Sequence, residues 1–165
     1  MDALLRIRTS LLSVADRLSW LPPTLARLAI GVVFVGTGWG KLHNLDKITS
    51  FFTELGIPVP GFNAVLVSSA ELICGALILV GLLTRLASLP LIVVMAVAIL
   101  TAKRGDIGGT SDLLGFVETL YIVLLSWLFT AGPGPISLDR LALRALGRLG
   151  DPRSPTSSAA PAHNQ

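Results

Sequence analysis

Four long apolar stretches constrain the fold of this chain more than any other feature of its sequence. Each is close to the roughly 20 residues that an α-helix needs to cross a hydrocarbon core of about 30 Å. Charged residues make up 14% of the chain, whereas soluble domains carry about 25%. The sequence therefore predicts an all-α, transmembrane four-helix bundle, whose spans cover about Thr24–Leu42, Asn63–Leu83, Thr84–Ala102 and Asp112–Ala131.

The breaks around these spans divide the chain into four parts. Residues 81–85 leave room only for a tight turn, so the second and third spans are expected to form an antiparallel hairpin. The Gly-Pro-Gly-Pro run at 132–135 ends the fourth span, because these residues break helices. We expect an N-terminal cytoplasmic amphipathic segment at 1–22, the bundle at 23–132, an amphipathic basic helix capped by Ser137 at 133–149, and a disordered tail at 150–165.

A short amphipathic helix is predicted between the first two spans. Its apolar residues recur at helical spacing, with Asn44 as the candidate N-cap and Gly56 as the stop: Leu45, Ile48, Phe51, Phe52 and Leu55. One interpretation is a membrane anchor without further function. The other is a cover over a lateral opening between the spans.

Basic residues predict the orientation of the bundle. Lys41, Lys47, Lys103 and Arg104 fall on one side of a four-span model, and the other nine of the 13 Lys and Arg residues fall on the opposite side. An excess of Lys and Arg marks the cytoplasmic side, so both termini are expected there. Arg27 and Arg85 are then expected to set the orientation in the membrane. The alternative is that they pair with a partner protein or with an acid such as Asp139. These basic residues indicate headgroup contacts and not a nucleic-acid surface.

The sequence offers few residues for redox or metal chemistry. Its single cysteine, Cys74, excludes an internal disulfide or a dithiol relay. Its two histidines, His43 and His163, provide neither a bis-His haem site nor a metal site. If redox chemistry takes place here, the electron carrier is expected to be diffusible or to belong to a partner.

Two acidic residues inside the apolar stretches are the candidate functional groups. Glu71 and Glu118 each lie within a predicted span, where an ionised carboxylate costs roughly 2.5 kcal/mol or more. Such acids are expected to pair with Lys41, to form hydrogen bonds within the bundle, or to be protonated. Ser68 lies one helical turn from Glu71, and Tyr121 one turn from Glu118.

These acids allow two interpretations, and neither gives a firm catalytic residue. They are either structural contacts that fix the register of the helices, or part of a polar pocket that binds a quinone or a small amphiphile. The candidate pocket consists of Lys41, Ser68, Glu71, Glu118 and Tyr121, with Glu71 and Glu118 as candidate proton-handling groups. A site completed by another chain is a third option. The first span contributes Gly36, Gly38 and Gly40, of which Gly36 and Gly40 have Gly-x-x-x-Gly spacing; these glycines allow close helix approach, either within the chain or in a homo-oligomer.

An ordered set of short motifs resembles the DoxX family of small bacterial membrane proteins. The motifs lie at residues 27–31, 38–41, 55–58, 71–75, 81–85 and 132–139. The resemblance implies a four-helix bundle in the bacterial inner membrane, and related proteins include the DoxD-type subunit of thiosulfate:quinone oxidoreductase. Arg27, Lys41, Glu71 and Arg85 match recurrent polar positions of the family, whereas Glu118 is less distinctive of it.

Residues and resemblance together predict an integral membrane subunit or accessory protein of a quinone-linked oxidoreductase system. It would not be self-sufficient in redox groups, and it would work with other membrane or peripheral redox subunits; no nucleic-acid partner is expected. Two alternatives stay open. One is a membrane chaperone or assembly factor that uses its polar groups to recognise partner helices, and the other is a small-molecule carrier.

Overall fold

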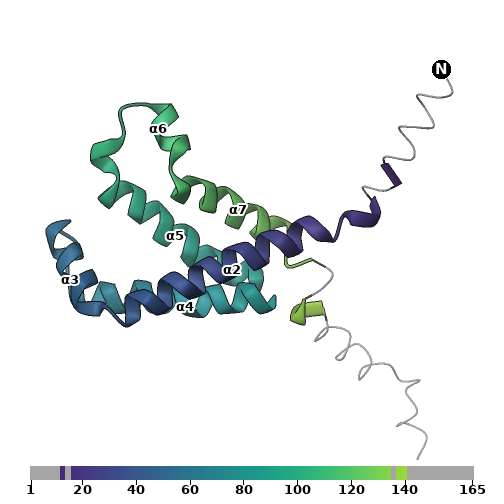
Figure 1. Cartoon of the computed structure of the whole chain (residues 1–165), viewed down its shortest axis with the longest axis horizontal. Helices are drawn as coiled ribbons and strands as arrows, with labels where there is room; N and C mark the ends of the chain where they lie inside the picture. Colours follow the sequence, from purple (N-terminus) through teal and green to yellow (C-terminus); the bar gives the residue numbers. More distant parts are fainter. Residues whose placement is uncertain (1–11, 14–15, 135–136, 141–165) are drawn as a thin grey trace, which may run out of the picture.

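The computed structural model describes residues 12–13, 16–134 and 137–140, and every regular element in this part of the chain is helical (Figure 1). The all-α prediction is therefore confirmed. Most of the predicted amphipathic segment at 1–22, most of the basic helix at 133–149 and the whole tail at 150–165 lie outside the described residues. In the described part of the basic helix, Ser137 Oγ accepts a hydrogen bond of 3.3 Å from the Arg140 N–H, as expected of an N-cap residue.

Three helices are long and apolar enough to cross a membrane. They are α4 (Pro60–Val80), α5 (Thr84–Ala102) and the helical run Asp16–Leu42, which contains α2 (Leu21–Leu42). A shorter apolar helix, α7 (Val117–Ala131), follows. The remaining elements are α3 (Leu45–Glu54), a 3₁₀ turn η1 (Arg104–Asp106) and α6 (Thr110–Gly115).

The fourth predicted span is not one continuous helix. Phe116 is extended, with φ −71° and ψ 136°, and separates α6 from α7. Gly115 directly precedes the break, and glycine is about 1 kcal/mol less favourable than alanine within a helix. Across the break, Thr119 Oγ1 donates a hydrogen bond of 2.6 Å to the Leu113 carbonyl oxygen. The prediction of an unbroken span over 112–131 is therefore wrong, because a side chain replaces part of the helical hydrogen bonding there.

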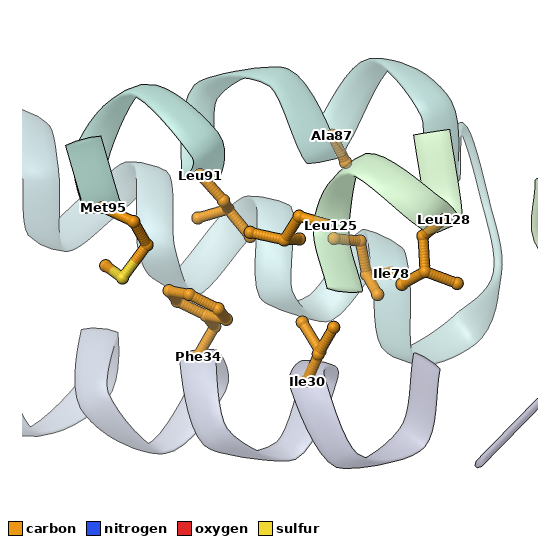
Figure 2. Close-up of a cluster of buried hydrophobic side chains, with 8 residues drawn as sticks. All are labelled: Ile30, Phe34, Ile78, Ala87, Leu91, Met95, Leu125 and Leu128. Atoms are coloured by element: carbon orange, nitrogen blue, oxygen red, sulfur yellow. The ribbon is translucent and has the colours of Figure 1, made fainter. Parts of the chain in front are cut away.

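The helices form two packed pairs that share one core. Helix α2 packs against α4 and α5 against α7, while α3 and α6 lie at the same end of the bundle (Figure 1). Figure 2 shows the core side chains of α2, α4, α5 and α7 turned toward one another: Ile30, Phe34, Ile78, Ala87, Leu91, Met95, Leu125 and Leu128. The turn between α4 and α5 confirms the predicted antiparallel hairpin.

Glycines bring α2 and α4 into backbone contact. A Cβ atom at Gly38 would lie 2.5 Å from the Leu72 backbone nitrogen, and a Cβ atom at Gly75 would lie 2.9 Å from Phe34 Cβ. By contrast, a Cβ atom at Gly36 or Gly40 would meet nothing within 4 Å. Of the three predicted glycines, Gly38 therefore makes the close approach within the chain, whereas Gly36 and Gly40 do not, because they lie on another face of α2.

The turn between α4 and α5 uses two residues in the left-handed region. Gly81 has φ +74° and Leu83 has φ +49°. A Cβ atom at Gly81 would collide with Arg27 Nη1 and would lie 2.8 Å from Ser137 Cβ, so only glycine fits. The Leu83 N–H donates a hydrogen bond of 3.0 Å to Asp139 Oδ1, and the Asp139 N–H donates one of 3.1 Å to the Gly81 carbonyl oxygen.

Two arginines also bind backbone at this end of the bundle, which we call the Arg27 end. Arg27 Nη1 donates to the Pro133 carbonyl oxygen at 2.9 Å, and Arg85 Nη2 donates to the Thr130 carbonyl oxygen at 3.2 Å. Arg27 is buried and Arg85 is exposed. Neither arginine forms the alternative ion pair with Asp139, because the Asp139 carboxylate is engaged by the turn.

Candidate ligand-binding site

A buried ion pair joins α2 to α4 at the opposite end, which we call the Lys41 end. Glu71 lies in the middle of α4 with a side chain that is 1% exposed, and its Oε1 lies 2.6 Å from Lys41 Nζ. Lys41 stands in the last turn of α2, and its side chain is 32% exposed. Gly38 lies three residues before Lys41 and against the backbone of Ser68 and Leu72, which flank Glu71. Close backbone approach at Gly38 thus positions the ion pair.

The second oxygen of the Glu71 carboxylate has no partner. Glu71 Oε2 is buried and accepts no hydrogen bond from any residue in the described part of the chain. Leaving a buried polar atom unpaired costs about 1–3 kcal/mol, and more for a charged group. Lys41 has three N–H donors, of which one is used in the bond to Glu71. The pair therefore retains both an acceptor and donors for a further group.

A cavity of about 460 Å³ adjoins this ion pair. Its walls come from α3, α4 and α5, and most of the lining is apolar. The lining residues are Lys41, Ile48, Phe51, Phe52, Leu55, Ile57, Asn63, Leu66, Val67, Glu71, Val93, Val94, Met95, Val97, Ala98, Thr101 and Ala102. Asn63 Nδ2 and Thr101 Oγ1 donate to nearby backbone carbonyl oxygens. The ion pair is therefore the charged element of a hydrophobic cavity.

Helix α3 forms one wall of the cavity. It spans Leu45–Glu54, close to the predicted range, and Gly56 follows it with φ +70°. Asn44 does not act as the predicted side-chain cap, because its Nδ2 donates back to the Gly40 carbonyl oxygen at 2.9 Å. The apolar residues of α3 that face the cavity are Ile48, Phe51 and Phe52, followed by Leu55. This placement matches a cover over the space between helices more closely than a free anchor.

The other candidate residues lie outside the cavity lining. Ser68 is buried, and its Oγ donates to the Ala64 carbonyl oxygen at 2.6 Å. Tyr121 packs against Phe34, with 5.5 Å between the ring centroids. Glu118 lies in the first turn of α7 and is partly exposed. The structure thus brings Lys41 and Glu71 together in the cavity wall, whereas Ser68, Glu118 and Tyr121 do not line the cavity.

Sequence reasoning missed the contribution of α5 to the site. Its lining residues range from Val93 to Ala102 and are mostly small or β-branched apolar side chains. Nothing in their pattern separates a cavity wall from a surface that faces lipid, because both are apolar. In the described residues, no three His, Cys, Asp or Glu side chains gather as potential metal ligands.

The fold and the site define a small helical membrane protein in which a buried ion pair borders an apolar cavity. The family model DoxX matches residues 23–104, a range that contains every lining residue of the cavity but not α6 or α7. The chain belongs to the DoxX family.

Relatives with this similarity come from several bacteria. The chain is 36% identical over 132 residues to the uncharacterized membrane protein Rv3486 of Mycobacterium tuberculosis, covering 72% of this chain and 81% of that protein. It is 29% identical over 121 residues to the inner membrane protein YphA of Escherichia coli, covering 70% and 86%. It is 29% identical over 110 residues to "Putative oxidoreductase CatD" of Bacillus subtilis, covering 67% and 77%. No solved structure matches the chain significantly.

Proposed function

We propose that this protein binds a lipophilic small molecule in the cavity at the Lys41 end and serves as an integral membrane subunit or accessory protein of a quinone-linked oxidoreductase system. The observation that carries the proposal is the meeting of a cavity of about 460 Å³ with the buried ion pair of Lys41 and Glu71. Small-molecule sites are typically cavities of about 300–1,000 Å³ with mostly apolar walls and a few polar groups.

A quinone fits the donor and wall chemistry of this site. The apolar walls suit a ring and an isoprenoid tail, and a free N–H of Lys41 suits a ring carbonyl oxygen. A bound quinone would supply two-electron redox chemistry, and Glu71 is the candidate group for holding a proton beside it. The oxidoreductase name of the relative CatD supports a redox role. Electron-transfer groups would come from a partner subunit, since the chain has one Cys and two His.

The test is to identify the lipophilic molecules that co-purify with the protein. We expect mass spectrometry to find a quinone or a related amphiphile with the wild type and less of it with Glu71→Gln, because the substitution removes the charge that holds Lys41 beside the cavity. Glu118→Gln is the matched control: it makes the same substitution at an acid outside the lining, and it should retain the wild-type amount.

Equal retention by the wild type and both variants would contradict a binding role for Glu71. A deletion strain that loses one client membrane protein, with quinone-linked respiration intact, would instead favour the assembly-factor alternative. The ligand measurement uses the full chain in its native membrane or in lipid nanodiscs.

We further propose that the protein lies in a bacterial inner membrane with four crossings and both termini in the cytoplasm. Support comes from the inner membrane name of its Escherichia coli relative YphA and from the unequal distribution of Lys and Arg. Alkaline phosphatase, which is active only in the periplasm, should stay inactive when fused after Ala131. Strong activity of that fusion would reverse the proposed orientation.

A further inference from the structure

Among the described residues, the Lys41–Glu71 pair has unused hydrogen-bond donors and an unused acceptor. These groups indicate which chemical form of ligand the cavity binds. We propose that the cavity prefers a neutral amphiphile with a hydroxylated head group, such as a hydroquinone or another phenol, to the corresponding quinone. This inference rests on the proposed function, because it names the ligand class of the same cavity.

The unpartnered oxygen of Glu71 calls for a hydrogen-bond donor. Oε1 already accepts from Lys41 at 2.6 Å, whereas Oε2 is buried without a partner among the described residues. An ionised carboxylate only accepts hydrogen bonds. A quinone carbonyl also only accepts, so a quinone leaves this oxygen unpaired. A hydroquinone brings an O–H group that can donate to the carboxylate.

Lys41 completes the recognition of a hydroxyl group. Its side chain is 32% exposed and lines the cavity, so N–H donors not used by Glu71 are available there. One hydroxyl group can accept from Lys41 and donate to Glu71 at the same time. Because the terminal torsion of a glutamate is soft, the carboxylate can turn its second oxygen toward such a ligand.

The charge balance of the site disfavours anionic ligands. Lys41 and Glu71 form a neutral pair whose acid is 1% exposed. The carboxylate of a fatty acid would add a second negative charge beside Glu71 with one lysine to share, and like charges in a poorly solvated site repel each other strongly. A neutral hydroxylated ring brings no net charge. A fatty acid is thus expected to bind more weakly than a phenol of similar size.

The wild-type protein tests this preference without any substitution. In nanodiscs under anaerobic conditions, binding is measured for 2-decyl-1,4-benzoquinone, for 2-decylhydroquinone and for the dimethyl ether of that hydroquinone. The ether keeps the tail, the ring and the acceptor oxygens but lacks the O–H donors. We expect the hydroquinone to bind at least about tenfold more tightly than either other probe, which corresponds to about 1.4 kcal/mol.

The outcomes separate this inference from the proposed function. Similar affinities for all three probes, or tighter binding of the quinone, would overturn the hydroxyl preference and leave ligand binding in the cavity standing. No binding of any probe would overturn both. In Glu71→Gln the preference should shrink, and in Glu118→Gln it should persist. A wild-type preference that survives unchanged in folded Glu71→Gln would overturn the assignment to Glu71.

Discussion

The two ends of the bundle use their charged residues in different ways. At the Arg27 end, charged side chains bind backbone: Arg27 donates to the Pro133 carbonyl oxygen, and Asp139 accepts from the Leu83 N–H. At the Lys41 end, a charged side chain binds another charged side chain, and one carboxylate oxygen stays unpaired in the wall of a cavity.

The difference indicates that the charged residues at the Arg27 end stabilise the fold, whereas those at the Lys41 end are available to bind a ligand. Contacts to backbone atoms at the Arg27 end fix the α4–α5 turn and the segment after α7, so they stabilise the architecture directly. Arg27 Nε is also unpartnered among the described atoms, but the same guanidinium already bonds Pro133 and does not line the cavity. At the Lys41 end, by contrast, incomplete pairing coincides with the open volume of the cavity.

The largest effect is expected when one partner of the ion pair is removed. Lys41→Met should lower the free energy of unfolding by about 3 kcal/mol, because it leaves a buried carboxylate without its cation. The double variant Lys41→Met/Glu71→Leu should regain most of that loss, since an apolar pair of similar volume is often neutral. Unfolding in mixed micelles, followed by tryptophan fluorescence, measures both. If the double variant regains stability and keeps ligand binding, the pair is structural only.

The second prediction concerns the close approach of α2 and α4, which positions the ion pair. Gly38→Ala should cost about 2 kcal/mol, because the new Cβ atom would lie 2.5 Å from the Leu72 backbone nitrogen. Gly36→Ala is the matched control on the same helix, where nothing lies within 4 Å, and it should not destabilise. Thermal unfolding of the two variants compares them. Equal losses would contradict the glycine contact described for Gly38.

A smaller effect is expected from loosening the Arg27 end. Asp139→Ala should cost about 1 kcal/mol, because the Leu83 N–H loses its acceptor. Asp139→Asn keeps an oxygen acceptor and should cost less. Ligand binding measured beside the unfolding curves should be unchanged in both variants, since Asp139 does not line the cavity. Loss of ligand binding at unchanged stability would show that the two ends are not independent.

The smallest effect concerns the exposed arginine of the same end. Arg85→Met should change the free energy of unfolding by no more than about 0.5 kcal/mol, because its bond of 3.2 Å to the Thr130 carbonyl oxygen is exposed to solvent. The same unfolding assay measures it. A loss as large as that of Lys41→Met would mean that exposed arginines at the Arg27 end matter as much as the buried ion pair.

Apolar length alone predicts α2, α4 and α5 to within about one turn, because a membrane crossing demands a certain number of apolar residues. The interruption at Phe116 is not predictable in this way. Its surroundings are as apolar as those of an unbroken span, and the hydrogen bond from Thr119 to Leu113 that supports it depends on three-dimensional contact.

For the site, the pairing of Lys41 with Glu71 follows from a lysine and an acid on neighbouring helices, with few other partners in an apolar environment. The sequence does not show which faces of the helices contact one another. Lipid is as apolar as the protein interior, so hydrophobic periodicity does not distinguish a packed face from one that faces lipid. For the same reason the sequence does not choose among Gly36, Gly38 and Gly40, of which the structure packs Gly38 against α4, and it groups Glu118 with a cavity that Glu118 does not line.

The ion pair belongs at once to the contact between α2 and α4 and to the cavity wall. Any compound that engages it must therefore raise the melting temperature of the protein, since binding to the folded form alone stabilises by about 2.7 kcal/mol at a concentration of one hundred times Kd. A library of membrane-soluble metabolites, screened simply by heating, would thus reveal the natural occupant before any reaction has been assigned to the protein.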